Sequence, residues 1–462
     1  MIQDNNRPKT FNNAIISSNP PSRLTISARR VFFGLSSFQI LAMFRRGLFY
    51  SYLSIYLRSF LGLSVTETTL FATLPMILNI TSQTFVWGPI SDKFQRRRTL
   101  VIMGETLAGL GTIIVWYVHV LADNLILAGY AIILGLSIVE IFWSMSNCGW
   151  SALISDLYPA KDRGDIQGRI SSVGGLGRIG GVWIGGLLYD GLQLQYPGWG
   201  FHSGWLFIIA ALVMFLSTIP MFFAPEGGIK REPQTQELPR VQIAENPTGT
   251  SQIFIVFLIA MIFINFGRNS VAVIISQYLD LDSGFAVSSE LLSYIVNTQS
   301  LAIIIMGFGV GWIGRRIGNG KTVLLGAGLA MIGLLLFAIA DNLILIFIGN
   351  FFRGCSQVIV IASSYAFASV LIPPKNRARL FAVFNATFFL SWGLAGTFIA
   401  GPLIDILLFT GYSEVFAYQM AFLAALGITF VGFLIHGVLL IGMRQKLKKW
   451  STNDSSSHSG IL

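Results

Sequence analysis

Residues 88–98 read GPISDKFQRRR, and they lie at the break between two long apolar segments. Asp92 is followed there by Lys93 and then by three consecutive arginines, residues 96–98. Short loops rich in lysine and arginine are typical of the cytoplasmic side of multi-spanning membrane proteins. The meaning of this stretch therefore depends on whether the rest of the chain supplies membrane helices around it.

The composition indicates a membrane protein. Of the 462 residues, 53% are hydrophobic and only 11% are charged, whereas soluble domains carry about a quarter charged residues. Apolar runs of about 20 residues, the length that crosses a bilayer, recur along the chain. The net charge of +10 would suggest a nucleic-acid partner in a soluble protein. Here the basic residues lie in short loops between apolar segments, so we expect no nucleic-acid binding.

The cysteines and the first residues add little to this picture. Cys148 and Cys355 lie in separate apolar segments, and they predict neither a disulfide framework nor a metal cluster. The first 30 residues are polar, so we expect no cleaved signal peptide. No cofactor is predicted.

We predict an all-α integral membrane protein, because a backbone in hydrocarbon must satisfy its hydrogen bonds within each segment. A capping box at residues 64–67 predicts the start of the second helix. Basic residues gather in alternate loops, and Arg58 is the one basic residue in the other loops, so we expect both termini in the cytoplasm. The twelve predicted helices cover residues 31–57, 66–90, 99–121, 124–155, 169–190, 203–224, 251–279, 289–312, 321–340, 343–372, 379–409 and 415–442.

The two halves of the chain repeat each other. The hexapeptide ADNLIL at 122–127 recurs at 340–345. Gly186 with Asp190 is likewise matched by Gly401 with Asp405. A fixed separation between matching segments indicates an internal duplication. We therefore predict two pseudo-symmetric six-helix bundles, with this division of the chain: a cytoplasmic tail at 1–30, bundles at 31–224 and 251–442, a flexible cytoplasmic linker at 225–250 and a cytoplasmic tail at 443–462.

The loop and the duplication together resemble the major facilitator superfamily (MFS). Its loop motif after the second helix, G-x-x-x-D-[RK]-x-G-[RK]-[RK], is matched here at its other positions, while Gln95 replaces the second glycine; the matching residues are Gly88, Asp92, Lys93, Arg96 and Arg97. Parallel six-helix repeats joined by a cytoplasmic linker also fit this fold. The resemblance spans all twelve predicted helices and implies a secondary transporter that works by alternating access.

The resemblance also implies a conformational latch built on Gly88, Asp92, Arg96 and Asp156. Asp92 would lie against the N-terminal end of the eleventh helix, where the helix dipole favours a carboxylate. Arg96 would pair with Asp156 at the cytoplasmic end of the fourth helix. The alternative is that the basic residues of this loop serve only to set the topology.

Glycines recur on one face of the fifth predicted helix, at Gly177, Gly181 and Gly185. They resemble an antiporter motif of the superfamily, although Val182 stands where that motif has proline. Small residues at every fourth position also allow another helix to approach closely, and this packing role is the alternative interpretation.

Polar residues form one stripe on each of the first, fourth, seventh and tenth predicted helices. Charged and polar residues are costly in lipid and are expected to face a cavity or a partner. The superfamily lines its central cavity with these same four helices. The predicted substrate pathway comprises Arg46, Tyr50, Glu140, Asn265, Arg268, Asn269, Arg353 and Gln357.

Similar depths along the helices suggest two ion pairs, Arg46 with Glu140 and Glu105 with Arg178. Five intramembrane arginines against two glutamates leave a positive cavity, so Arg46, Arg268 and Arg353 are candidates to hold an organic anion. The alternative is that these arginines serve only as partners in ion pairs. Glu140 is the candidate proton carrier, or it only neutralises Arg46.

We therefore expect a membrane transporter rather than an enzyme, because no catalytic constellation is recognisable. Its expected partners are the lipid bilayer, a small-molecule substrate of anionic character and protons, and we expect a monomer in the plasma membrane. Two alternatives remain: an exporter of apolar or cationic drugs, and a membrane sensor with the same fold that transports nothing.

Overall fold

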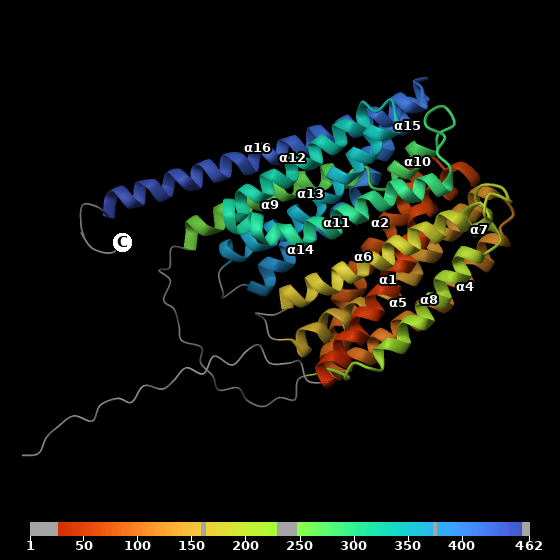
Figure 1. Ribbon diagram of the computed structural model, residues 1–462, viewed down its shortest axis with the longest axis horizontal. Helices are drawn as coiled ribbons and strands as arrows, with labels where there is room; N and C mark the ends of the chain where they lie inside the picture. Colours follow the sequence, from red (N-terminus) through yellow and green to blue (C-terminus); the bar gives the residue numbers. More distant parts are fainter. Residues whose placement is uncertain (1–25, 159–162, 229–246, 373–376, 455–462) are drawn as a thin grey trace, which may run out of the picture.

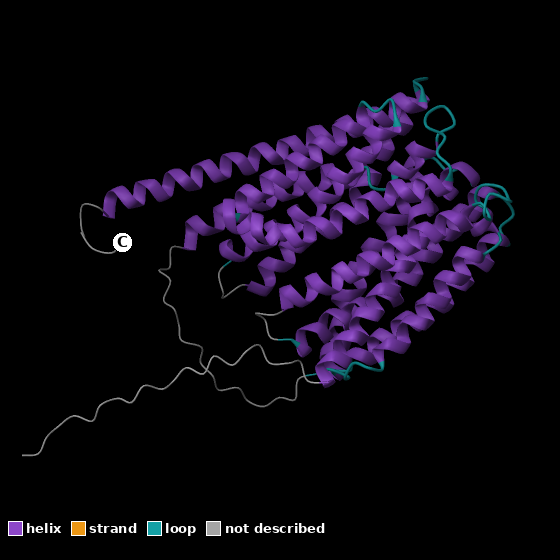
Figure 2. Ribbon diagram, viewed as in Figure 1, coloured by secondary structure: helices purple, strands orange, loops and turns teal. Residues whose placement is uncertain are grey.

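The computed structural model describes residues 26–158, 163–228, 247–372 and 377–454. These residues form helices joined by short loops, and no strand occurs among them (Figure 2). The N-terminal half contains α1 (Ile26–Ile55) continued by η1 (Tyr56–Phe60), α2 (Val65–Ser82) with η2 (Gln83–Trp87) and α3 (Gly88–Phe94), α4 (Arg97–Val120), α5 (Leu125–Leu157), α6 (Arg163–Tyr189), the short α7 (Trp199–His202) and α8 (Trp205–Met221).

The C-terminal half repeats this order of elements. It contains α9 (Pro247–Ser270) with α10 (Ile274–Asp280), α11 (Ser289–Ile317), α12 (Asn319–Ala338), α13 (Leu343–Leu371), α14 (Arg377–Ala395) with η4 (Gly396–Ala400) and α15 (Gly401–Phe409), and α16 (Glu414–Asp454). Nine helices among the described residues are long and apolar enough to cross a membrane. The twelve predicted segments each correspond to one helix or one run of consecutive helices, with α1, α6 and the 17-residue α8 completing the set.

Local sequence signals explain where several helices begin. The Ser64 hydroxyl accepts a hydrogen bond from the Glu67 N–H (3.2 Å), and the Glu67 carboxylate accepts one from the Ser64 N–H (2.8 Å), which completes the predicted capping box. The repeated ADNLIL hexapeptide caps a helix in both halves. Asn124 accepts from the Leu127 N–H (2.8 Å), and Asn342 accepts from the Leu345 N–H (3.1 Å).

The structure extends several helices beyond their predicted bounds, and α6, for example, begins at Arg163 rather than at 169 and α11 ends at Ile317 rather than at 312. Helix α9 begins at Pro247 rather than near 251, and α16 continues to Asp454 beyond the predicted end at 442. The start of the predicted linker is docked: the Glu226 carboxylate lies 3.2 Å from Arg98 and accepts from the Thr99 N–H (2.9 Å). Residues 229–246 of the linker lie outside the described part of the chain.

The two halves lie side by side (Figure 1). Helix α1 packs against α6 and α8 within the first half, and α9 packs against α14 and α16 within the second. The halves meet along α6 with α11 and along α2 with α14. We call the side on which α1 and α9 begin the termini side and the opposite side the far side.

Polar contacts between the halves gather toward the far side. The Asp405 carboxylate in α15 accepts from the Val65 N–H (3.0 Å) and the Thr66 N–H (2.8 Å) at the first turn of α2. In the matching place, Ser289 at the start of α11 donates to Asp190 (2.6 Å). We call these two contacts the far-side clasp. A carboxylate at a helix N-terminus satisfies unpaired N–H groups and the helix dipole.

Candidate functional site

The termini-side loop differs from the expectation at one residue. Arg97, not Arg96, contacts Asp156, with 3.3 Å between Nε and the carboxylate, and it also lies 3.3 Å from Asp92. The predicted pairing of Arg96 with Asp156 is therefore wrong. The chain turns at Gln95, and α4 begins at Arg97, which directs Arg97 inward and leaves Arg96 exposed.

Gln95 replaces the second glycine of the motif and adopts the backbone conformation of a glycine at this turn. Its backbone is left-handed (φ 56°), a conformation that glycine adopts without strain. Its side-chain amide donates to the Asp92 carbonyl (2.8 Å), which supports this turn locally. The Asp92 side chain itself is 80% exposed and accepts from Arg97, and no contact between it and the eleventh helix is seen among the described residues.

The three glycines of α6 lie directly against the backbone of α1. A Cβ at Gly177 or Gly181 would collide with the carbonyl oxygens of Ile40 and Phe44, respectively. A Cβ at Gly185 would lie 2.5 Å from the Leu48 carbonyl oxygen. These glycines therefore allow the close approach of two helices within the first half.

Glu140 and Arg46 do not form the predicted ion pair. The Glu140 carboxylate accepts a hydrogen bond from the side-chain amide of Asn79 on α2. The Arg46 guanidinium instead lies over the Trp143 ring, 4.4 Å from its centre, a distance at which a cation is attracted to the aromatic face.

Glu105 and Arg178 also do not pair. Glu105 accepts hydrogen bonds from the Trp143 indole N–H (2.9 Å) and from the Ser146 hydroxyl (2.8 Å). The reason lies in the helix arrangement: α4 packs against α5 and α8, whereas α6 packs against α1 and α11. Equal depth in the membrane therefore does not bring these two residues together.

A polar pocket lies within the C-terminal half, between α9, α11, α12 and α13. Arg268 from α9 and Arg353 from α13 both line it, and Ala330 and Leu334 contribute apolar surface; its other lining residues are Asn269, Gln299, Ser356 and Gln357. The Ser356 hydroxyl is buried and has no hydrogen-bond partner among the residues that the structure describes.

Neutral groups orient the two arginines of this pocket. Arg268 Nε donates to the Asn265 side-chain oxygen (3.2 Å), and Arg353 Nη1 donates to the Asn350 side-chain oxygen (3.0 Å). Neither arginine forms an ion pair with a carboxylate of the described residues. Between residues 251 and 442 the sequence has six acidic residues, and all lie at far-side ends of helices or in far-side loops: Asp280, Asp282, Glu290, Asp341, Asp405 and Glu414.

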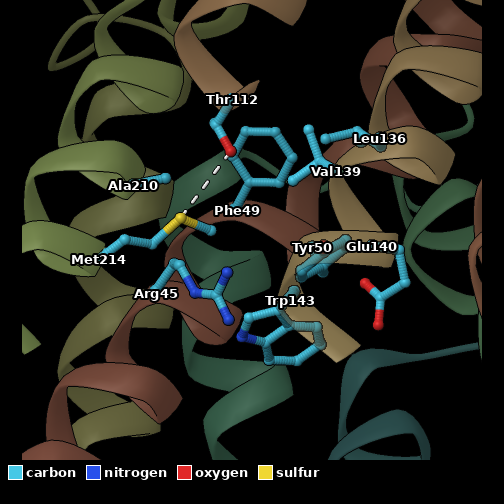
Figure 3. Close-up of a pocket in the computed structure, with 10 residues that line it drawn as sticks. All are labelled: Arg45, Phe49, Tyr50, Thr112, Leu136, Val139, Glu140, Trp143, Ala210 and Met214. Carbon is cyan, nitrogen blue, oxygen red and sulfur yellow. Dashed lines mark hydrogen bonds between the residues drawn. The ribbon is translucent and has the colours of Figure 1, made fainter. Parts of the chain in front are cut away.

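Two other predicted pathway residues, Asn269 and Gln357, line this same polar pocket. Asn269 donates to the Ser391 hydroxyl (2.8 Å), and Gln357 accepts from Gln299 (3.1 Å). Tyr50 lies in the N-terminal half, where it lines a second pocket together with Arg45 and Glu140 (Figure 3). Arg45 therefore points into its own bundle, and Arg46 stays the candidate for the face between the halves.

Comparisons with known proteins agree with this architecture. The sequence profile of the Major Facilitator Superfamily matches residues 35–396 and 257–458. The chain belongs to the Major Facilitator Superfamily. It is a multi-pass membrane transporter of this superfamily. The chain is 25% identical to the multidrug resistance protein MdtG of Proteus mirabilis (strain HI4320) over 301 residues, which are 64% of this chain and 69% of MdtG.

Solved structures with the MFS fold are similar over nearly the whole chain. A bacterial homologue of the human lysosomal transporter Spinster, in an inward-facing and unoccupied conformation, has a TM-score of 0.67 at 14% identity and covers 90% of this chain and 97% of its own. The nucleoside transporter NupG has a TM-score of 0.67 at 15% identity and covers 89% of this chain and 99% of its own. At these identities the likeness concerns the fold alone.

Several residues that contact the predicted pathway residues were not predicted from the sequence. Asn79 and Gln299 come from α2 and α11, outside the four helices on which the polar stripes were sought. Each is a polar side chain within an apolar segment, and this signal was available in the sequence. Trp143 gave no such signal, because an aromatic residue in a membrane helix is unremarkable until its neighbours are known.

Proposed function

We propose that this MFS transporter carries a small organic anion, which binds at Arg268 and Arg353 in the pocket of the C-terminal half. Two guanidinium groups that share one pocket and have no carboxylate partner in the described part of the chain supply strong donors for an anionic group. An uncompensated charge buried away from water is costly, so a bound anion would offset that cost. The unpaired Ser356 hydroxyl and the neighbouring amides add hydrogen-bonding groups for orientation.

This proposal revises the residues expected from the sequence. Arg46 was a candidate to hold the anion together with Arg268, but its guanidinium lies over Trp143 in the other half. The single observation that carries the proposal is that Arg268 and Arg353 line one pocket, with no acidic residue among the described residues that line it. The pocket belongs entirely to one bundle and would move with it when the halves rock.

We further propose that the protein lies in the plasma membrane with the termini in the cytoplasm. The supporting observation is the sequence distribution of lysine and arginine, which accumulate in the loops on the termini side. The far-side clasp would then close the extracytoplasmic side, and the substrate pathway would face the cytoplasm in this conformation.

We propose that transport is coupled to protons and that Glu140 carries the proton. The alternative is that transport is coupled to exchange against a counter-substrate. Glu140 is buried, and a neutral amide, Asn79, holds it. A buried carboxylate without a bonded cation is able to take up a proton when its surroundings change. We expect Glu140→Gln to abolish uptake driven by a pH gradient in proteoliposomes while exchange of labelled for unlabelled substrate continues. Equal loss of both activities would contradict the proton role.

The anion proposal is tested by thermal shift. Purified protein in detergent is screened against carboxylated, phosphorylated, neutral and lipophilic cationic compounds, because a ligand that binds the folded state raises Tm. We expect an organic anion to raise Tm, and Arg268→Ala and Arg353→Ala each to abolish the shift. Arg315→Gln is the matched control, since it removes an exposed positive charge of the same half and should keep the full shift.

The similarity to MdtG favours a second candidate function, the export of drugs. The same screen separates the two proposals. If lipophilic cations alone raise Tm, and Arg268→Ala leaves that shift unchanged, the anion proposal is wrong and the exporter proposal replaces it. A site for cations would be expected to present carboxylates, and the C-terminal pocket presents none among the residues that line it.

A further inference from the structure

The second pocket lies inside the N-terminal bundle and is separate from the proposed substrate site. Helices α1, α4, α5 and α8 enclose it, and the side chains that face it are mostly hydrocarbon, aromatic or thioether groups (Figure 3). Phe49, Leu136 and Met214 are each less than 5% exposed. The proposed anion site does not include this pocket, although Glu140, the proposed proton carrier, forms part of its wall.

Two of the three guanidinium nitrogens of Arg45 in this pocket have no hydrogen-bond partner among the described residues. Arg45 is 2% exposed, and its Nε and Nη2 atoms are buried without a hydrogen-bond partner. An arginine stays protonated in proteins and has five N–H donors to satisfy. Leaving such donors unpaired in a low-dielectric interior costs free energy. The pocket therefore contains a buried cation that needs an acceptor.

Three other polar side chains of the pocket already form hydrogen bonds, and Tyr50 also lines it. The Thr112 hydroxyl donates to the Ala108 carbonyl (2.8 Å), and the Trp143 indole N–H donates to Glu105 (2.9 Å). Glu140, the one carboxylate that lines the pocket, accepts from Asn79. Figure 3 shows the Trp143 ring between the Arg45 guanidinium and the Glu140 carboxylate.

We propose that this pocket binds a small monovalent inorganic anion of chloride size at Arg45. The anion would accept hydrogen bonds from the free Nε and Nη2 groups, and charge-assisted hydrogen bonds of this kind are strong. The Trp143 ring lies 4.4 Å from the Arg45 guanidinium carbon and would close one side of the site. Buried apolar side chains would exclude larger ions.

The apolar part of the wall suits an anion better than a water molecule. A buried water needs several polar partners, including acceptors for its own two protons. Phe49, Leu136 and Met214 offer no such acceptor, and the acceptor oxygens on the wall belong to Tyr50, Thr112 and Glu140. A halide needs donors only, which Arg45 supplies, and it tolerates hydrocarbon and the positive edges of aromatic rings around it.

The test compares halide and non-halide salts. Tm of the purified full-length protein is measured in sodium chloride and in sodium gluconate at equal ionic strength. We expect Tm to be higher in chloride by at least about 1 °C, because a ligand that binds only the folded state stabilises it. Arg45→Met should remove this difference. Arg46→Met should keep it, because Arg46 contacts the same Trp143 ring but does not line the pocket.

A direct measurement covers the case in which Arg45→Met does not fold. Crystals of the wild-type protein grown in bromide should show an anomalous scattering peak beside Arg45. An equal Tm in both salts overturns the proposal, as does a difference that persists in Arg45→Met. A bromide peak at Arg353 with none at Arg45 also overturns it, because the halide would then occupy the substrate pocket.

Discussion

Arg96 and Arg97 are neighbours in the chain but have opposite surroundings. The Arg97 side chain is 6% exposed and contacts both Asp156 and Asp92, whereas Arg96 is exposed to solvent. We expect Arg97→Gln to lower the free energy of unfolding by about 1.5–3 kcal/mol, because it removes hydrogen bonds to charged groups. Arg96→Gln should change it by less than about 0.5 kcal/mol. Denaturation of both variants in detergent checks this, and equal losses would show that the loop is not organised by Arg97.

Gly180 and Gly181 offer a second pair of adjacent positions with different surroundings. A Cβ at Gly181 would collide with the main chain of Phe44, whereas a Cβ at Gly180 would meet only its ring at 3.7 Å. Gly181→Ala should therefore destabilise the protein by about 1–3 kcal/mol, the usual cost of overpacking. Gly180→Ala should be tolerated. Thermal unfolding of the two variants decides, and a tolerated Gly181→Ala would mean that α1 and α6 separate easily.

At the scale of elements, the far-side clasp connects the two halves through helix starts. Asp405 binds the first N–H groups of α2, and such an interaction is worth about 1 kcal/mol. Asp405→Asn should therefore shift the equilibrium toward opening of the far side by roughly fivefold.

Thiol labelling measures this opening. In a background with Cys148 and Cys355 replaced by serine, Thr69→Cys places a buried thiol at the contact between α2 and η4. Asp405→Asn should increase its rate of modification by a maleimide. Asp123→Asn removes an exposed far-side carboxylate and should leave the rate unchanged. Equal rates in all three proteins would mean that the clasp does not hold the far side closed.

At the scale of the whole molecule, alternating access requires the far-side contacts to break during each cycle. The hydroxyls of Thr69 and Thr397 lie 2.7 Å apart across the two halves. Cysteines at both positions, again without the native cysteines, should be close enough to form a disulfide. The oxidised protein should bind the anion found by thermal shift but fail to transport it in proteoliposomes, and a reductant should restore transport. Continued transport by the cross-linked protein would exclude rocking of the halves at this contact.

Much of this architecture was predictable from the sequence, because the forces behind it act locally. Bilayer thickness determines the length of each apolar segment, and unsatisfied backbone groups are too costly in hydrocarbon for anything but helices there. The duplication was visible as ADNLIL in both halves, and it places Asn124 and Asn342 at equivalent helix starts. The capping box before α2 was predictable for the same local reason.

The tertiary structure alone decided which charged groups meet. Helical spacing placed Glu105 and Arg178 at similar depth, yet they lie on helices that are not neighbours, and Glu105 bonds to Trp143 and Ser146 instead. It also separated Arg45, which lines a pocket inside one bundle, from Arg353, which lines a pocket in the other. The physical reason is that periodicity specifies a residue's face and depth on its own helix, whereas its partner depends on which helix packs against that face.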